Sequence, residues 1–405
     1  MDIFAGDTAQ LRLFPECGMA LEELPTPCLV LDTDRLERNI ARFREHWQGG
    51  GVRVRPHLKT CRTWPVALQA MESPEGPCCV ATMGEAEACA ELGAEDIVLA
   101  VGIRPGLFER ARALLGRGTD LKVLLDSAVM ARALAGYAAQ TGTVFSVLLE
   151  VDCDGHRAGL APEDPRLAEI ADLLAAAGQK VAGILTHAGS AYDVPDPAKL
   201  RTLASREMAA AAKAAALLRA HGHACPVVSI GSTPTGLLGS PAEAASRGVT
   251  EVRAGVYMFM DLVMEGLGVC TKEDIALTVL TSVIGGFAGD GGLPGRLITD
   301  AGWAALSTDR GLASRFASQG YGLVCDLAGT PLPGLRAADL NQEHGMISVN
   351  PNLPEQTERA VLGLTPESRL RILPNHACAA AMMHRGYFLA RGGRALAFAR
   401  RFGGW

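Results

Sequence analysis

The sequence predicts an α/β protein, with a (β/α)8 TIM barrel followed by a mostly β C-terminal domain. Three observations support this fold class. Between about residues 52 and 253, short apolar runs of strand type alternate with alanine-rich helical segments. The number of runs, eight, favours a closed parallel barrel over an open doubly wound sheet. After about residue 270 the helical rhythm ends, and short apolar runs broken by Gly, Pro and Asp replace it.

The expected elements follow in order along the chain. A buried strand is expected at 26–32 (TPCLVLD), and we expect it to pair with the second domain because it precedes the first barrel repeat. A helix is expected over 33–47, with Thr33 or Asp34 as its N-cap. Its apolar residues recur at helical spacing, at Leu36, Ile40, Phe43 and Trp47. The barrel strands are expected at 52–56, 77–81, 97–101, 121–125, 144–151, 181–187, 226–230 and 249–253.

The length of the chain sets its domain organisation. The chain has 405 residues, and 48% of them are hydrophobic, so it can bury more than one core. We expect the barrel to span residues 33–268. Residues 1–32 together with 269–405 are expected to form the β-rich second domain.

Charge and cysteine content exclude several classes of protein. The net charge is −6 and no basic block occurs, so nucleic-acid binding is not expected. No apolar run reaches about 18 residues, so no membrane span is expected. The N-terminus lacks the basic and apolar regions of a signal peptide. Eleven cysteines are an odd number without the spacing of a secreted disulfide framework, and they predict a reduced, cytoplasmic protein.

The stretch VRVRPHLKT, residues 52–60, ends the first barrel strand with a lysine. Val52 and Val54 alternate with two arginines, as in a strand, and Pro56 then stops the ladder. Lys59 comes just past that stop, where a barrel enzyme places reactive groups. An isolated lysine is more often an exposed side chain in a turn. The loops after the other strands must therefore decide its role.

Polar loops follow four further barrel strands. The loops after the fifth and sixth strands, DCDGHRAG and THAGSAYD, carry Arg157, His187 and Tyr192. GSTPTG, after the seventh strand, offers glycine for close backbone approach and hydroxyl donors, and AGVY after the eighth offers backbone N–H groups. Together they would cradle a phosphate, although an ordinary turn has a similar composition. Pyridoxal phosphate needs a phosphate anchor and a lysine, so a lysine opposite such a cradle predicts this cofactor.

The motifs RPHLKT, HAGSAY, SIGSTPT, VRAGVYMFMD and PNHAC, in this order, carry a specific resemblance. The chain resembles the D-threonine aldolase/D-serine dehydratase family of pyridoxal-phosphate enzymes, whose barrel is alanine-racemase-like (fold type III). The likeness extends over nearly the whole chain, from TPCLVLDTDRLERNI to the closing RFGGW. It implies a barrel with a β domain, a small D-amino acid as substrate, and assembly as a homodimer.

The resemblance implies roles for individual residues. Lys59 would be the Schiff-base lysine and the base that removes the Cα proton of a D-amino acid. Arg157 matches an arginine near the cofactor ring, where it would hold the phenolate oxygen by a charge-assisted hydrogen bond. His187 and Tyr192 match residues that line the pocket, with structural hydrogen bonding as the alternative. The positions that match the phosphate site are Gly231, Ser232, Thr233, Gly255, Val256 and Tyr257.

LPNHACAA, residues 373–380, places His376 and Cys378 two positions apart. On an extended segment this spacing puts both side chains on one side. Imidazole and thiolate suit zinc, and manganese is the other ion considered. A buried pair that binds no metal is the alternative on composition alone. By resemblance, this position holds a divalent metal beside the cofactor, and His-x-Cys matches the dehydratase branch whereas the aldolase branch has His-x-Asp.

Two positions depart from the family pattern. Cys61 and Ser190 stand where the family motifs usually have histidine. If either histidine normally contacts the substrate or moves a proton, this protein would use a different substrate or proton route.

The leading hypothesis is therefore a pyridoxal-phosphate- and metal-dependent lyase. It would dehydrate a β-hydroxy-D-amino acid, such as D-serine, D-threonine or D-threo-3-hydroxyaspartate, to a 2-oxo acid and ammonia. Retro-aldol cleavage to glycine and an aldehyde is the main alternative, because the metal would serve either reaction. A racemase would need a second base opposite Lys59. A non-enzymatic protein that binds pyridoxal phosphate would have no need of a metal.

Overall fold

The computed structural model describes residues 18–287, 292–311, 320–402 and 404; the first 17 residues of the predicted second domain lie outside the described residues. The chain divides into two compact units. One comprises Ile40–Tyr257 with Phe402–Trp405, and the other comprises Met1–Asn39 with Met258–Arg401. We call them the barrel unit and the β unit.

The barrel unit confirms the predicted (β/α)8 architecture. Within the described residues its sheet has eight strands, in the order β2-β9-β8-β7-β6-β5-β4-β3, and every neighbouring pair is parallel. A parallel bridge between His57, just past the end of β2, and Cys79 of β3 brings the two edges together, so the barrel is nearly closed. The strands are β2 (Arg53–Pro56), β3 (Cys78–Val80), β4 (Asp96–Gly102), β5 (Asp120–Leu125), β6 (Ser146–Val151), β7 (Lys180–Thr186), β8 (Val227–Ile230) and β9 (Glu251–Ala254).

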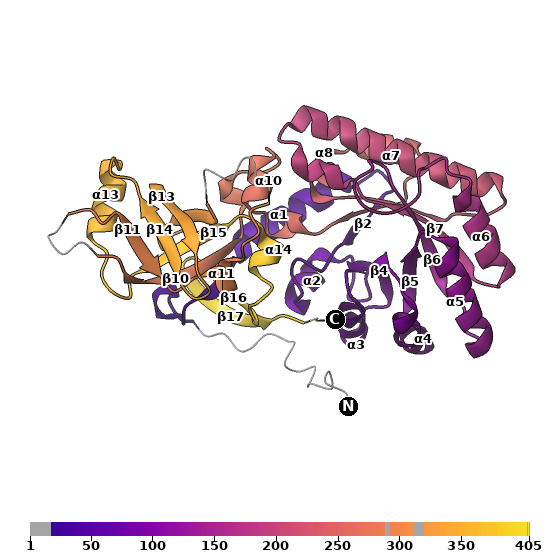
Figure 1. Ribbon diagram of the computed structural model, residues 1–405, viewed down its shortest axis with the longest axis horizontal. Coiled ribbons are helices and arrows are strands. Elements are labelled where there is room, and N and C mark those ends of the chain that lie inside the picture. The colour runs from indigo at the N-terminus through magenta and orange to yellow at the C-terminus, as the bar shows by residue number, and fades with distance from the viewer. Residues whose placement is uncertain (1–17, 288–291, 312–319, 403, 405) are drawn as a thin grey trace. The chain divides into compact units, whose positions relative to one another are not determined.

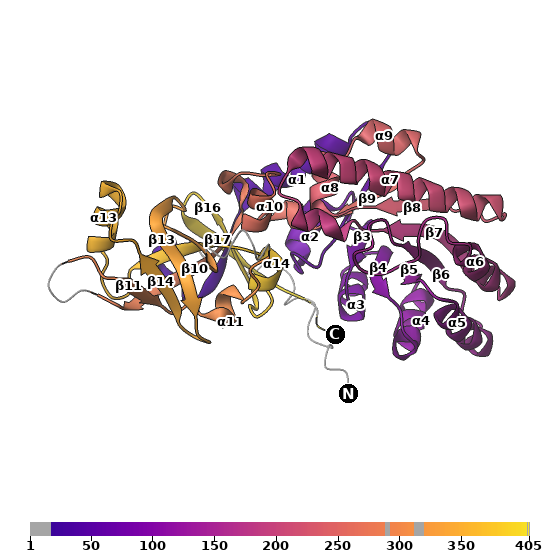
Figure 2. The ribbon, with the colours of Figure 1, turned by 45° about the horizontal axis from the view of Figure 1, so that its top comes forward.

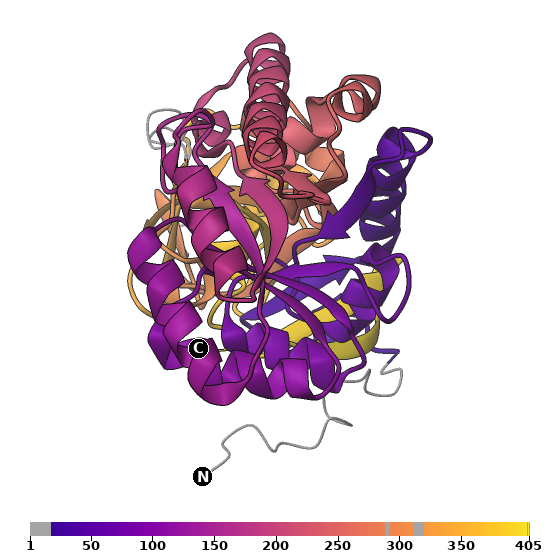
Figure 3. The same cartoon turned by 90° about the vertical axis from the view of Figure 1, so that its right-hand side faces the viewer.

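Helices lie on the outside of these strands, as the end-on view in Figure 3 shows. Apolar side chains fill part of the interior, namely Cys79, Val98, Leu124, Leu148, Ala182 and Leu185. The outer helices are α2 (Trp64–Ala70), α3 (Met83–Glu91), α4 (Phe108–Gly116), α5 (Ala128–Thr141), α6 (Arg166–Ala176), α7 (Pro197–Ala220), α8 (Thr233–Leu238) and α9 (Pro241–Ser246).

Helix α1 (Thr33–Trp47) has the predicted bounds but a different cap. Asp32 Oδ1 accepts a hydrogen bond from the Arg35 backbone N–H at 2.9 Å. The helix begins at Thr33 itself, so the residue before it satisfies the free N–H groups of the first turn. The prediction of Thr33 or Asp34 as the N-cap is therefore wrong.

The β unit confirms the mostly β second domain (Figures 1 and 2). Its described residues form a nine-stranded sheet in the order β11-β14-β13-β12-β15-β10-β1-β16-β17. Strand β10 also pairs with β11, which closes six of the strands into a ring. The strands are β1 (Cys28–Asp32), β10 (Leu277–Gly285), β11 (Arg296–Thr299), β12 (Gly322–Cys325), β13 (Pro331–Leu340), β14 (Gly345–Val349), β15 (Arg369–Pro374), β16 (Gly386–Arg391) and β17 (Arg394–Arg400).

The early strand β1 belongs to this unit, as predicted. It runs antiparallel to β10 and parallel to β16. The unit also contains short helices, namely α10 (Leu262–Gly266) before β10, and α11 (Trp303–Leu306), α13 (Glu355–Leu362) and α14 (Ala377–Ala380) between later strands. Across the described ranges of both units, no helix combines the length and the apolar character that a membrane crossing requires.

Candidate active site

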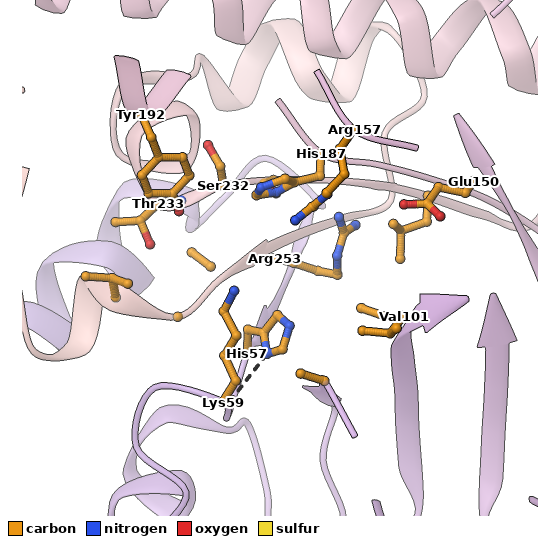
Figure 4. Close-up of a pocket in the computed structure, with 17 residues that line it drawn as sticks. His57, Lys59, Val101, Glu150, Arg157, His187, Tyr192, Ser232, Thr233 and Arg253 are labelled. Carbon is orange, nitrogen blue, oxygen red and sulfur yellow. Dashed lines mark hydrogen bonds between the residues drawn. The ribbon is translucent and has the colours of Figure 1, made fainter. Parts of the chain in front are cut away.

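A pocket opens at the carboxyl ends of the barrel strands (Figure 4). Nine of the ten residues predicted to bind the cofactor line it: Lys59, Arg157, His187, Tyr192, Gly231, Ser232, Thr233, Gly255 and Val256. These residues come from the ends of different strands, which the parallel barrel brings to one face. The site also contains side chains that the sequence did not single out as ligands: His57, Glu150 and Arg253.

Tyr257 is the predicted residue that does not line this pocket. Its side chain is buried, and its ring stacks on Phe43 with the centroids 4.2 Å apart. The short 3-10 turn over Val256–Met258 comes directly after β9. A tyrosine whose ring packs in the core has only its backbone to offer the pocket.

Lys59 lies in a tight turn just past β2. The Leu58 N–H donates to Cys79 O at 2.8 Å, and the Arg62 N–H donates back to Leu58 O at 2.8 Å. The Lys59 side chain is exposed, and Figure 4 shows its amino group pointing into the pocket. The backbone N–H of Lys59 donates to His57 Nδ1 at 3.4 Å. Lys59 thus lies in a hydrogen-bonded turn, and its amine is directed into the pocket.

The opposite wall is the start of α8, where the loop after β8 turns into a helix. Ser232 caps this helix by accepting from the Thr235 N–H at 3.3 Å. The Thr233 N–H donates to the Tyr192 hydroxyl at 3.4 Å. Thr233 Oγ1 is buried and has no hydrogen-bond partner among the described residues. A buried hydroxyl beside a pocket without a partner is suited to a polar ligand group.

Two glycines let the backbone approach closely at this wall. Gly231 has φ +136°, and a Cβ there would lie 2.0 Å from Arg253 O. A Cβ at Gly255 would lie 2.8 Å from both His57 O and Thr60 Oγ1. Any side chain at these positions would force the strand ends apart.

The histidines of the pocket are held in neutral forms. His187 Nδ1 donates to Gly231 O at 2.8 Å, so Nε2 carries the lone pair. Burial and the nearby Arg157 lower the pKa of His187 to about 3. Burial, Lys59 and Arg253 likewise hold the pKa of His57 well below its usual range. Neither ring adds a positive charge at neutral pH.

Arg253 supplies a fixed charge at the base of the pocket. It is buried on β9, and its Nη2 donates to Thr186 O at 2.6 Å while its Nη1 donates to Ser229 Oγ. Burial lowers the pKa of this guanidinium from its ordinary value. The sequence does contain a clue to this role, because Arg253 lies between Val252 and Ala254 in a predicted barrel strand. A charged side chain is rarely buried in such a strand unless it has a partner or a function.

Glu150, the next-to-last residue of β6, forms another part of the wall. Burial and the neighbouring Asp126 raise its pKa, while Arg157 acts to lower it. Arg157 itself is exposed in the loop after β6, and Figure 4 shows it beside His187. The pocket is therefore lined by three basic side chains, Lys59, Arg157 and Arg253, and by one carboxylate, Glu150, that offsets part of their positive charge.

His376 and Cys378 are brought together in the β unit. The segment is not extended as predicted, because His376 is the N-cap of the short alanine-rich helix α14 and Cys378 lies in its first turn. Asp261 Oδ2 stabilises that start by accepting from the Ala377 N–H at 2.9 Å. The two side chains nevertheless meet, since a hydrogen bond joins His376 to Cys378.

The partner of His376 on its other side is a carboxylate. His376 Nδ1 donates to Asp309 Oδ2 at 2.7 Å. Burial acts to lower the pKa of His376, but hydrogen bonds to Asp309 and Cys378 outweigh it and raise the pKa to about 11. No cluster of three or more metal-binding His, Cys, Asp or Glu side chains occurs in the part of the chain that the structure describes. A metal here would have His376 and Cys378 as its protein ligands and other positions open.

The two departures from the family pattern lie outside the pocket wall. Cys61 is buried, and its Sγ donates to Leu58 O at 3.5 Å. Ser190 is held through its backbone N–H, which donates to Asp154 Oδ2 at 2.8 Å. Neither residue lines the pocket.

Comparison with known families assigns both parts of the chain. Residues 31–263 match the family described as alanine racemase, N-terminal domain, and residues 276–390 match the putative serine dehydratase domain. The chain belongs to the D-serine dehydratase family of alanine-racemase-like proteins. The predicted resemblance is confirmed.

Members of this dehydratase family with assigned activities cover almost the whole chain. D-threo-3-hydroxyaspartate dehydratase of Delftia sp. strain HT23 is 45% identical over 90% of this chain and 93% of that protein. D-serine dehydratase of Dictyostelium discoideum is 29% identical, over 91% and 93%. 3-Hydroxy-D-aspartate aldolase of Paracoccus denitrificans strain Pd 1222 is 27% identical, over 93% and 91%.

Solved structures of the Delftia family member superpose on nearly the entire chain. Its structure gives a TM-score of 0.88 at 43% identity, covering 95% of this chain and 100% of that one. A cysteine-to-alanine variant of it is described as metal-free, with a TM-score of 0.88, 42% identity, and coverage of 96% and 100%. A histidine-to-alanine variant two positions earlier has also been solved. That His-x-Cys spacing equals the spacing of His376 and Cys378.

Proposed function

We propose that this protein is a lyase that uses pyridoxal phosphate and a divalent metal to dehydrate a β-hydroxy-D-amino acid to a 2-oxo acid and ammonia. D-threo-3-hydroxyaspartate is the first candidate substrate, because the 45% identical relative is the dehydratase of that compound. D-serine and D-threonine follow. The observation that carries the proposal is the pocket in which Lys59 faces a wall with an unpartnered buried hydroxyl, Thr233 Oγ1.

The residues of the pocket fit pyridoxal phosphate. Lys59 would hold it through Nζ. The hydroxyls of Ser232 and Thr233 and the backbone at Gly255 and Val256 would hold its phosphate, and Gly231 leaves room for it. When bound, this cofactor supplies an aldehyde that binds amino groups and a ring that accepts electrons from Cα.

The side chains of the pocket then have separate tasks. Lys59 is the amine in position to take the Cα proton. Arg157 offers charge-assisted hydrogen bonds to an anionic oxygen. His187 is fixed by Gly231 O and neutral, so it presents Nε2 as an acceptor without adding charge. Arg253 keeps a positive charge at the base of the pocket.

The residues at α14 fit a divalent ion. His376 would bind through Nε2, because its Nδ1–H is committed to Asp309, and Cys378 would bind as a thiolate. When bound, the ion supplies a Lewis acid that weakens the C–O bond of a β-hydroxyl. Zinc suits this ligand pair, and manganese is the second candidate.

Retro-aldol cleavage is the second candidate function, and it is supported by the 27% identity of this chain to 3-hydroxy-D-aspartate aldolase of Paracoccus denitrificans. Elimination and cleavage share the first binding steps but break different bonds. Elimination removes the Cα proton and expels hydroxide, whereas cleavage removes the hydroxyl proton and breaks Cα–Cβ.

Product analysis separates the two reactions. The purified protein with pyridoxal phosphate and zinc or manganese is given D-threo-3-hydroxyaspartate and, separately, D-threonine. Dehydration yields oxaloacetate and 2-oxobutanoate, respectively, each with ammonia. Glyoxylate or acetaldehyde, each with glycine, would replace the proposal by the aldolase reaction.

We further propose that the enzyme is a homodimer of the cytoplasm. None of the ten cysteines of the described residues forms a disulfide, which suits a reducing compartment. Light scattering on the purified chain tests the dimer, and a monomeric mass would contradict it.

A further inference from the structure

One buried carboxylate of the barrel unit has no part in the chemistry described above. Glu207 lies in the middle of α7 and is 1% exposed. It does not line the pocket. A buried ionisable side chain costs stability unless its hydrogen bonds are satisfied, and an apolar residue would serve a merely structural helix at least as well.

The partners of Glu207 all belong to the loops that build the pocket. Its Oε1 accepts from the backbone N–H groups of Ala188 at 3.1 Å and Gly231 at 3.0 Å. Its Oε2 accepts from Thr235 Oγ1 at 2.7 Å. Among the described residues these three contacts are all donors, which is the environment that an ionised carboxylate requires. Burial raises the pKa of Glu207, while these hydrogen bonds and Arg253 act to lower it.

The contacts join two loops directly behind the phosphate wall. Ala188 follows His187 in the loop after β7, and Gly231 precedes Ser232 in the loop after β8. The loops also touch on the pocket side, where His187 donates to Gly231 O and the Thr233 N–H donates to Tyr192. Glu207 thus holds the loops after β7 and β8 together on the side away from the pocket, while the opposite side of these loops lines the pocket.

The third contact reaches the cap of α8. The Thr235 hydroxyl has one hydrogen, and Glu207 accepts it. Thr235 Oγ1 therefore turns its lone pairs to the Ser232 N–H at 3.2 Å and to Ser232 Oγ at 2.9 Å. The Ser232 hydroxyl must then be the donor in its contact with Thr235 Oγ1, so Glu207 fixes the orientation of the Ser232 side chain at the pocket wall.

We propose that Glu207 is a positioning residue that sets the affinity of the pocket for the phosphate group of its cofactor. This inference rests on the proposed function, because it assumes that the cradle holds the phosphate of pyridoxal phosphate. Glu207 acts through Gly231, Ser232 and Thr235 and touches no ligand itself.

Glu207→Gln is the informative variant because it keeps the shape of the side chain. Glutamine offers one oxygen in place of two, so either the two backbone N–H groups or the Thr235 hydroxyl must face an N–H donor. Glu243→Gln is the matched control. Glu243 is a half-buried carboxylate that accepts from Ser205 of the same helix α7 and pairs with Arg247 but is not part of the pocket.

The test compares two probes on the full-length chain stripped of cofactor. Dissociation constants are measured for pyridoxal phosphate and for pyridoxal, which lacks the phosphate. In Glu207→Gln we expect the preference for the phosphorylated probe to fall by about tenfold, equivalent to about 1.4 kcal/mol. Pyridoxal affinity should be nearly unchanged, and Glu243→Gln should keep the wild-type preference. A residue that only stabilised the fold would weaken both probes alike.

The outcomes separate this inference from the proposed function. An unchanged preference in Glu207→Gln overturns the inference, even if the melting temperature falls. A wild-type protein that binds neither probe, or binds both equally, overturns the proposed function itself. If Glu207→Gln does not fold, Thr235→Val decides. It keeps the backbone contacts of Glu207 and removes the Thr235 hydroxyl, which links Glu207 to Ser232. It should reduce the same preference; no reduction contradicts the inference.

Discussion

The pocket of the barrel unit and the His376 site of the β unit each contain a histidine held through the same atom, yet the pKa values of the two rings are shifted in opposite directions. His187 Nδ1 donates to a carbonyl oxygen, that of Gly231, at 2.8 Å. His376 Nδ1 donates to a carboxylate, that of Asp309, at 2.7 Å. Burial with Arg157 nearby lowers the pKa of His187 to about 3. Against the effect of burial, Asp309 and Cys378 raise the pKa of His376 to about 11.

The difference lies in the charges around each ring. The groups that act on His187 are cations, namely Arg157, Arg253 and Lys59. Those that act on His376 are acidic groups, namely Asp309, Cys378 and Asp261. A cationic pocket attracts an anion such as a phosphate ester, and an anionic one attracts a metal ion. Each site is therefore matched electrostatically to the group proposed for it.

The largest expected effect on activity comes from replacing Lys59 in the pocket. Lys59→Ala should abolish cofactor attachment and lower turnover by at least about a thousandfold, since a positioned proton-transfer group alone contributes about 10²–10⁴-fold. The measurements are the absorbance of protein-bound cofactor and the rate of ammonia release. Lys180→Ala, at the first residue of β7 and hence at the other end of the barrel, should leave both unchanged. Full activity in Lys59→Ala would remove the lysine from the mechanism.

The residues of the barrel pocket were only partly predictable from the sequence. The strand rhythm placed Lys59 and the GSTPTG loop at one end of a barrel, because parallel strands bring their carboxyl ends together. Arg253 was missed as a ligand because its inward direction depends on the register of β9, which strand patterning does not specify to one residue. Tyr257 does not line the pocket, and its ring stacks on Phe43 of α1, a partner more than 200 positions away that local sequence does not reveal.

The β unit was harder to predict for a related reason. His376 and Cys378 are visible as a local motif, but Asp309 lies 67 positions away in a loop without pattern. The helical turn at α14 depends on Asp261, which is 116 positions away. Local sequence therefore gave the candidate ligands, while tertiary contacts gave their geometry and charge.

The second prediction concerns the metal ligands. Cys378→Ala should keep bound cofactor and lose metal-dependent turnover, because one of two protein ligands is gone. Metal content after gel filtration and turnover before and after chelation are the readouts. We expect a loss greater than the about 10–100-fold that is typical when a group behind a ligand is removed. Cys270→Ala, another half-buried cysteine of the β unit, is the control. Turnover that resists both chelation and Cys378→Ala would exclude a metal role.

The third prediction tests the carboxylate that distinguishes the two histidines. Asp309→Asn keeps an acceptor for His376 Nδ1 but removes the charge, which makes the His376 site resemble that of His187. Metal affinity should fall by about 10–100-fold, the usual effect of losing such a partner. Titration of the metal-free protein with zinc measures it, and cofactor binding is the internal control. Unchanged zinc affinity would mean that Asp309 does not orient a ligand.

The smallest expected effect is on the acid stability of the pocket. The pKa of His187 in the folded protein, about 3, lies below its value of about 6.5 in an unfolded chain. Between these values the unfolded chain binds a proton that the native protein does not. Stability from this group is therefore fully present above about pH 6.5 and is lost as the pH falls toward 3, by at most about 1.4 kcal/mol per pH unit.

Urea unfolding of the cofactor-free protein at pH 6.5 and pH 5 measures this slope. His187→Asn removes the titrating ring and keeps an N–H that can donate to Gly231 O, so its unfolding free energy should fall less steeply with acid than that of the wild type. His221→Asn, at the exposed end of α7, controls for the loss of an imidazole elsewhere. Equal slopes in His187→Asn and the wild type would mean that His187 titrates alike in the folded and unfolded chains. The cations of the pocket would then not govern its charge, and the contrast with His376 would rest on Asp309 alone.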